Sequence, residues 1–108
     1  MNYKVTATPR FLKDVKALSR KYSSLKQEIA ELINSLQVHP EQGTPIGHHC
    51  YKIRLAIASK GKGKSGGARV ITCIRIVSTT VFLLAIYDKS EKENITNQEL
   101  QSLLKLIS

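Results

Sequence analysis

Acidic residues are missing from the middle of this 108-residue chain: no Asp or Glu occurs between Gln42 and Tyr87. The same stretch holds seven of the seventeen basic residues, namely Lys52, Arg54, Lys60, Lys62, Lys64, Arg69 and Arg75. Ordinary solvated surfaces mix both signs of charge, so this stretch indicates a face that binds anions. The flanking segments carry their own acids, which makes the positive field local. RNA or DNA is the first partner that this pattern suggests.

Long apolar runs are also lacking, and cysteine is scarce. No run approaches the ~18 apolar residues of a membrane span, and no apolar signal region follows the first residues. We therefore expect a cytoplasmic protein. In that compartment Cys50 and Cys73 are expected to be reduced thiols rather than a disulfide. The length suits a single domain spanning 1–108, and the sequence contains no repeat, low-complexity tract or linker.

The chain begins with a pattern typical of a strand followed by a helix. Residues 2–7 alternate apolar and polar side chains, as a half-buried strand does. Thr8 and Pro9 are typical of a helix start, and apolar residues then recur at helical spacing to about residue 21.

A second helix is expected to follow directly. Ser24 and Gln27 form a capping-box pattern, and an apolar stripe runs through residues 25–36. Pro40 is expected to end this helix. The next residues, 42–49, contain Gly and Pro at intervals and predict a loop.

The second half predicts three strands and a last helix. Residues 50–58, 68–77 and 80–88 have strand-like patterns, and their short connections predict an antiparallel meander. Thr96 and Glu99 form another capping box ahead of an apolar helical face. The order βααβββα predicts an α+β fold. The expected core includes Leu12, Val15, Leu32, Ile33, Ile53, Leu55, Val70 and Leu83.

One phosphate-binding motif is rejected on its context. Residues 58–65 (ASKGKGKS) fit a loose form of the P-loop pattern. A P-loop needs a helix to begin immediately afterwards, so that the first amides of the helix meet the phosphate. Here the β-branched strand 68–77 follows instead. The segment is interpreted as a lysine-rich hairpin loop that can still contact a nucleic-acid backbone.

The adjacent residues His48, His49 and Cys50 do not predict a metal site. A tetrahedral site needs ligands that converge from separated positions, and the sequence offers no such spacing. The histidines are interpreted as polar loop residues. His49 stays a weak candidate for a general base, since imidazole exchanges protons near neutral pH.

Strand alternation gathers part of the basic stretch on one face. Lys52 and Arg54 project to the same side of their strand, and Arg69 on the next strand can project to that side as well. Two interpretations remain open at this point. The three cations form an anion-binding patch, or Lys52 and Arg54 only keep an exposed sheet face soluble.

Three segments resemble the RelE/ParE superfamily of bacterial toxins: 50–55 (CYKIRL), 60–71 (KGKGKSGGARVI) and 87–96 (YDKSEKENIT). Within it, the chain looks most like the HigB-like branch of RelE-type toxins. The resemblance covers nearly the whole chain, including the order of the elements. It implies a RelE-like, microbial-ribonuclease-like fold, in which a curved, antiparallel-rich sheet packs on the N-terminal helical hairpin. It also implies a cognate antitoxin protein that neutralises the toxin.

The resemblance also implies an activity. RelE-type members cleave messenger RNA in the ribosomal A site, where a ribose 2′-OH attacks the neighbouring phosphate without a metal or other cofactor. A base must take the hydroxyl proton, and cations must stabilise the negative charge of the transition state. By position, Lys52 and Arg54 match the family's basic strand residues, and Arg69 matches its phosphate-stabilising arginine. Lys92 falls where the family places another basic residue.

The chain departs from RelE at two positions. Thr96 stands where RelE has a proton-transferring tyrosine, and Ser90 stands at a position that is basic in RelE. A threonine hydroxyl is a poor base, and Thr96 is better interpreted as a helix cap. Proton transfer then passes to Lys52, Lys92 or the ribosome, or the activity is weaker. Tyr87 is a spare candidate, although an aromatic residue that ends a strand more often belongs to the core.

Further basic residues are expected to contact RNA: Lys60, Lys62, Lys64, Arg75 and Lys89. Two other function classes stay open. One is ParE-like inhibition of DNA gyrase by binding, and the other is a noncatalytic module that binds RNA or the ribosome. Discrete RNA cleavage products distinguish a nuclease from both.

Overall fold

The computed structural model describes residues 2–61, 66–92 and 94–107. In these ranges the chain forms β1 (Lys4–Ala7), α1 (Pro9–Ser19), α2 (Leu25–Val38), β2 (Thr44–Gly47), β3 (Cys50–Leu55), β4 (Ala68–Arg75), β5 (Thr80–Asp88) and α4 (Asn97–Leu104). Short 3-10 turns lie at Ala58–Lys60 and Lys105–Ile107. The expected α+β class and element order are confirmed, with β2 as an additional strand. None of the helices in these ranges has the length and apolar character that crossing a membrane requires.

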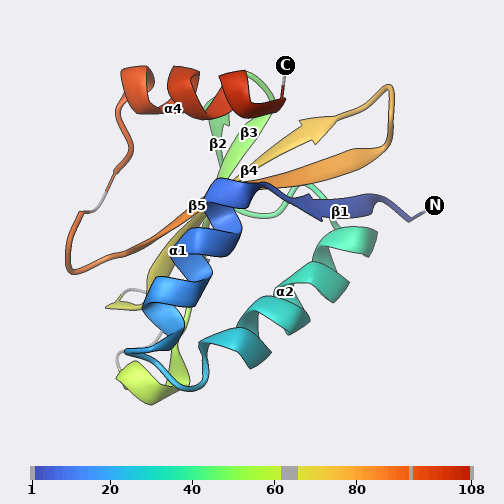
Figure 1. Ribbon diagram of the computed structural model, residues 1–108. Helices are drawn as coiled ribbons and strands as arrows, with labels where there is room; N and C mark the ends of the chain where they lie inside the picture. The colour runs from blue at the N-terminus through green and yellow to red at the C-terminus, as the bar shows by residue number, and fades with distance from the viewer. Residues whose placement is uncertain (1, 62–65, 93, 108) are drawn as a thin grey trace.

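The strands form one sheet in the order β1-β5-β4-β3-β2 (Figure 1). Strands β3, β4 and β5 are the expected antiparallel meander. Strand β1 lies parallel to β5, with Lys4 opposite Thr80. Alternation along a strand reports only which side chains are buried, so it predicts β1 but not the direction of its partner. Strands β3 and β4 end earlier than expected, at Leu55 and Arg75, because the chain turns away from the sheet there.

Residues 42–49 were expected to be a loop, and this prediction is wrong, because they contain β2. Pro45 is tolerated in β2 because an edge strand leaves one side of its backbone without a ladder partner. His48 and His49 form the turn into β3, with left-handed φ angles of 55° and 61°. Two successive left-handed residues are the backbone of a tight two-residue hairpin. The Gly and Pro residues therefore mark an edge strand with a bulge.

Two of the three expected helix caps are present. The Thr8 hydroxyl accepts a hydrogen bond from the first turn of α1, and Thr96 and Glu99 form a complete capping box on α4. The capping box predicted for α2 is wrong. Ser24 makes no side-chain cap bond, and its hydroxyl donates to the Glu28 carboxylate instead (3.1 Å).

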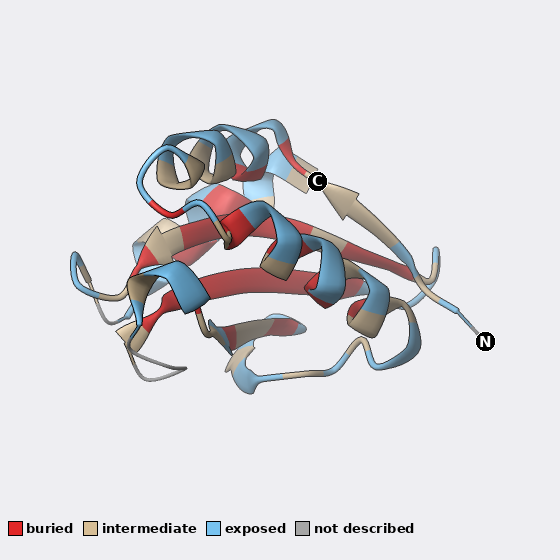
Figure 2. Cartoon of the chain, turned by 90° about the horizontal axis from the view of Figure 1, so that it is seen from below, coloured by how far each residue is buried: buried red, intermediate tan, exposed pale blue. Residues whose placement is uncertain are grey.

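Apolar residues pack on both faces of the sheet, and the central strands are buried along most of their length (Figure 2). Helices α1 and α2 share one core cluster with Val70, and α4 shares the other with Ile71. Of the residues expected in the core, Leu32, Ile53, Val70 and Leu83 are buried, and Val15, Ile33 and Leu55 are partly buried against it. Leu12 was predicted wrongly, since 59% of it is exposed. The preceding residue, Phe11, takes the inward position.

Candidate active site

The register of the sheet places cations side by side on the face that α4 partly covers. Arg54 on β3 lies directly opposite Arg69 on β4, and Arg69 lies opposite Tyr87 on β5. Directly opposed residues project to the same face. We call Arg54, Arg69 and Tyr87 the cationic row. Lys52 lies two residues along β3 from Arg54, and therefore on the same face.

The two arginines of the cationic row differ in exposure. Arg54 is exposed, whereas Arg69 is 1% exposed and donates one hydrogen bond from Nη1 to the Ala68 carbonyl at 3.1 Å. Like charges directly opposite each other on neighbouring strands destabilise a sheet. The expected co-facial placement of Lys52, Arg54 and Arg69 is what the register shows.

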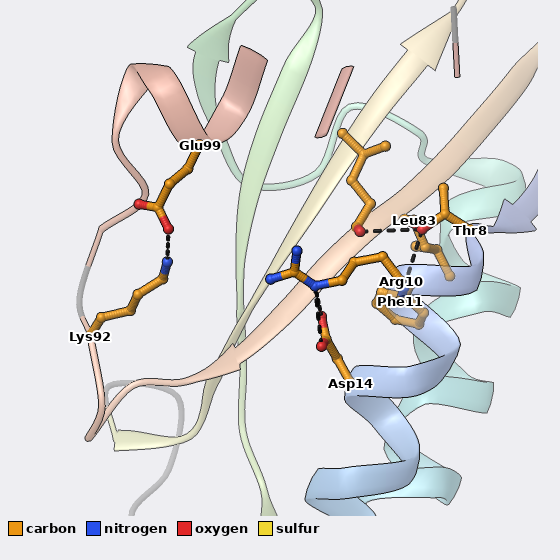
Figure 3. Close-up of polar contacts among 8 residues, drawn as sticks. Thr8, Arg10, Phe11, Asp14, Leu83, Lys92 and Glu99 are labelled. Carbon is orange, nitrogen blue, oxygen red and sulfur yellow. Dashed lines mark hydrogen bonds and ion pairs between the residues drawn. The ribbon is translucent and has the colours of Figure 1, made fainter. Parts of the chain in front are cut away.

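The segment between β5 and α4 brings Lys92 to the same place. The Lys92 ammonium lies 5.0 Å from the centre of the Tyr87 ring. It also pairs with the Glu99 carboxylate in the first turn of α4 (Figure 3). This pairing, together with the hydrogen bond from the Thr96 amide, lowers the pKa of Glu99 to about 2. The Thr96 hydroxyl accepts from the Glu99 amide at 3.1 Å, so it serves as a helix cap.

Asn94 is a site residue that the sequence did not predict. The Lys52 ammonium donates to Asn94 Oδ1 at 2.6 Å, across 42 positions of sequence. Both residues line a cavity of about 240 Å³ together with Ile46, Thr96 and Asn97. The bond fixes the Lys52 ammonium at the mouth of this cavity. A local signal for such a contact is lacking, because an Asn in a polar segment is also typical of a turn.

Lys60 lies in a buried polar network, away from solvent. Its ammonium donates to Asp88 Oδ1 at 2.5 Å, and its side chain is 9% exposed. Tyr22 donates to the other Asp88 oxygen at 2.6 Å, and Ser90 donates to Asp88 Oδ1. Burial favours a higher pKa for Asp88, but the bonds from Lys60, Tyr22 and Ser90 outweigh it and hold the pKa far below the usual range. Lys60 therefore anchors the chain to the end of β5.

The other expected RNA-binding residues are dispersed. Lys62 and Lys64 lie outside the described residues. Arg75 is exposed at the opposite end of β4 from Arg69, six residues or ~20 Å along the strand. Lys89 directly follows β5, and its amide donates to the Gly67 carbonyl at 3.1 Å. Of the expected site residues, the structure thus brings together Lys52, Arg54, Arg69 and Lys92.

The candidate base His49 lies in the turn between β2 and β3, five residues along β3 from the level of Arg54. At ~3.3 Å per residue it is therefore well separated from the cationic row. Among the described residues, no group of three His, Cys, Asp or Glu side chains is arranged to hold a metal ion.

The sequence and the fold were compared with those of known proteins, and both match one family. A family model described as the RelE toxin of the RelE/RelB toxin–antitoxin system matches residues 13–108. A similar fold occurs in the RelBE2 toxin–antitoxin complex of Mycobacterium tuberculosis, with a TM-score of 0.61 and 20% identity over 82% of this chain and 92% of that chain. A mutant E. coli RelE in the free state gives a TM-score of 0.57 and 19% identity over 100% of both chains. Isolated E. coli RelE gives 0.52 and 19% over 96% and 98%.

The fold and the site define a small α+β protein with a cationic sheet face. Because the family match spans most of the sequence, the chain belongs to the RelE toxin family of toxin–antitoxin systems. The expected superfamily and RelE-like fold are confirmed. The finer likeness to the HigB-like branch stays a prediction.

Proposed function

We propose that this protein is the toxin of a type II toxin–antitoxin system and cleaves messenger RNA on the ribosome. The observation that carries the proposal is the pair Arg54 and Arg69, directly opposed on neighbouring strands and with Lys52 on the same face. Two arginines on one sheet face suit a ligand that carries negative charge, because guanidinium groups bind phosphate and carboxylate oxygens strongly. An RNA phosphate is such a ligand, and membership of the RelE family supports this choice.

In the proposed reaction, a ribose 2′-oxygen forms a bond to the adjacent phosphorus, and the bond from phosphorus to the 5′-oxygen of the next nucleotide breaks. The products are a 2′,3′-cyclic phosphate and a free 5′-hydroxyl. Arg69 stabilises the additional negative charge on the phosphate, and Arg54 holds a non-bridging oxygen. Lys52 and Lys92 are the candidates that take the 2′-proton and return a proton to the leaving oxygen. Because Arg69 is buried, the substrate phosphate has to replace protein contacts around its guanidinium.

The direct test is to incubate the purified protein with translating ribosomes and a messenger RNA, and to map the 5′-ends by primer extension. We expect discrete cuts that need ribosomes, and their loss in Arg54→Ala. Lys26→Ala is the matched control, because Lys26 is an exposed cation on α2, away from the cationic row. Inhibition of the supercoiling activity of DNA gyrase, without any cleavage of RNA, would favour the ParE-like alternative.

We further propose an antitoxin partner and a cytoplasmic site of action, where ribosomes are found. The M. tuberculosis relative was solved as a toxin–antitoxin complex. A formal net charge of +9 suits an acidic antitoxin segment that covers the cationic row, with charge complementarity speeding association. Association measured across a salt series should slow and weaken as ionic strength rises. Affinity that is independent of salt would contradict this electrostatic account.

A further inference from the structure

A second cavity, of about 350 Å³, lies next to the cationic row, between α1, β5 and α4. Strand β5 contributes Ala85, Ile86 and Tyr87 to its lining. Ile95 and Leu103 add further apolar surface. A hollow of this size and apolar character is typical of a small-molecule site.

Polar groups stand among this apolar lining. They are Arg10 from α1, Lys92, and Glu99 and Ser102 from α4. Arg10 extends from α1 while its Nε bonds Asp14 at 3.2 and 3.3 Å (Figure 3). The Ser102 hydroxyl donates only to the Gln98 carbonyl in its own helix (3.1 Å), so its oxygen keeps accepting capacity. The cavity thus combines apolar walls with donors and acceptors.

Tyr87 belongs both to this cavity and to the cationic row. It lies directly opposite Arg69, and neighbouring strands are ~4.8 Å apart. A group held at Tyr87 therefore lies close to a phosphate held at Arg69. Lys92 connects the two sites as well, because its ammonium lies over the Tyr87 ring.

We propose that this cavity receives a nucleobase of the RNA substrate, adjacent to the phosphate under attack. A base has flat apolar faces and polar edges, and the lining matches both features. The Tyr87 ring and the aliphatic side chains contact the faces, as aromatic residues do in single-stranded RNA recognition. Glu99, Ser102 and Arg10 read the edge. This inference rests on the proposed function, and it assigns the choice of cleaved nucleotide to this cavity.

The sharpest variant fills the cavity without substituting any residue of the cationic row. Ser102 is exposed on α4, so Ser102→Phe places a ring in the hollow at little risk to the fold. The matched control is Gln101→Phe, which puts the same ring on the other flank of α4, where Gln101 faces His48. Melting temperatures of both variants, compared with the parent protein, check that each is folded.

The first measurement titrates the full-length, isotope-labelled protein with the four ribonucleoside 5′-monophosphates and, separately, with ribose 5-phosphate. We expect NMR shifts at Tyr87, Lys92 and Ser102 that depend on the base. Ser102→Phe should weaken this binding at least about tenfold, because a single stacked base contributes roughly that factor. Gln101→Phe should bind as the parent does. Shifts that are equal for ribose 5-phosphate, or unchanged in Ser102→Phe, would overturn the inference.

The second measurement maps the cut sites on ribosome-bound RNA. We expect Ser102→Phe to cut more slowly and to lose the parent's preference for the nucleotide beside the cut, while Gln101→Phe keeps the parent rate and pattern. If the parent protein cuts no RNA, the proposed function fails. The nucleotide titration then still tests whether the cavity binds a nucleobase. An unchanged pattern in Ser102→Phe overturns the inference alone. It is also overturned if Ser102→Phe impairs only antitoxin binding, since the cavity then belongs to that partner.

Discussion

Arg54 and Arg69 oppose each other on neighbouring strands, although a sheet gains stability from opposite charges in such positions. Arg69 is also only 1% exposed, and moving a guanidinium group out of water carries a desolvation cost. A residue that lowers stability in this way is expected at a functional site rather than in a structural core. The guanidinium is also held in place before any substrate binds, which is the condition for strong transition-state stabilisation.

The first prediction concerns Arg69→Ala. We expect ribosome-dependent cleavage to fall ~10²-fold to 10³-fold, because one preorganised donor to the developing charge is lost. The melting temperature should stay close to that of the parent, since relief of the repulsion with Arg54 offsets lost packing. Cleavage rate, growth inhibition and thermal melting are the measurements. If Arg69→Ala inhibits growth as strongly as the parent and the control Lys26→Ala do, then Arg69 has no role in catalysis.

The second prediction concerns Asn94 as a positioning residue for Lys52. Asn94→Ala should lower cleavage roughly 10-fold to 100-fold, because the ammonium loses the acceptor that orients it. In Asn94→Asp a carboxylate faces the ammonium and stabilises its charged form, so the pH–rate profile should move to higher pH if Lys52 is the base. Asn97→Asp adds the same charge to the same cavity at a residue that is not the acceptor of the Lys52 hydrogen bond, and should shift the profile less. Identical profiles for Asn94→Asp and the parent would show that Lys52 is not the base.

For individual residues, the sequence predicted which cations share a sheet face but not what each side chain contacts. Strand alternation and the family resemblance suffice for Lys52, Arg54 and Arg69, because both depend on local pattern. Lys60 was expected to meet RNA, yet its partner Asp88 lies 28 positions away, and only the folded chain brings the two together. A solitary acid at the end of the apolar strand β5 is the signal that points to a buried partner.

At the scale of elements, the hairpin from β2 to β3 shows the limit of turn signals. Its two central residues, His48 and His49, are both left-handed, a backbone that Asn and Gly usually supply. The sequence therefore carried no sign of a tight hairpin, and β2 went unpredicted. In contrast, the helix start at Thr96 and Glu99 depends only on two side chains and adjacent amides, and was predicted correctly.

The register between β3 and β4 places Cys50 directly opposite Cys73. The Ile74 amide donates to the His49 carbonyl, which makes the adjacent pair hydrogen-bonded and Cys50–Cys73 the non-hydrogen-bonded pair. Cα atoms in such pairs lie ~4.5 Å apart, within the ~4.4–6.8 Å that a disulfide spans. Both thiols are free. The interaction between the two neighbouring thiols raises the pKa of Cys50, as burial does, and lowers the pKa of Cys73.

The third prediction follows from this register: hydrogen peroxide should close a disulfide between Cys50 and Cys73. Each thiol gives up its hydrogen, the sulfurs bond, and the peroxide is reduced to two waters. Burial slows the reaction but does not block it, because peroxide is small. Intact mass should fall by two hydrogens, with full recovery after reduction. Cys50→Ser should show no such loss, and retention of both free thiols in the treated parent would contradict the prediction.

For the whole molecule, Asp88 connects parts that are distant in sequence. It accepts hydrogen bonds from Tyr22, between α1 and α2, from Lys60 in the 3-10 turn after β3, and from Ser90 after β5. The helical hairpin, the meander and the C-terminal segment therefore meet at one carboxylate. The element order was predicted from sequence, since periodicity reports burial, and the packing of the sheet on the helical hairpin was expected from the family resemblance. This junction was not, because two of its contacts, from Tyr22 and Lys60, join residues that lie far apart in the sequence.

The last prediction is a loss of stability in acid that depends on Asp88. Its pKa in the folded protein lies below the value of ~3.9 for an unfolded chain, so the stabilisation is complete above that value. It is lost as the pH falls through ~3.9 toward the lower folded pKa, as the unfolded state binds the proton first. Asp88→Asn should destabilise the protein by about 3–5 kcal/mol at neutral pH, because Lys60 stays buried without a counter-charge. It should also flatten the acid limb of the stability curve.

Urea unfolding at a series of pH values measures both effects. Asp14→Asn is the matched control, because Asp14 pairs with the exposed Arg10 and contributes at most ~1 kcal/mol. The control should keep the slope of the acid limb, whereas Asp88→Asn should lose it. If the two variants are equally stable at pH 7 and show the same acid limb, then the junction at Asp88 does not hold the three parts of the fold together.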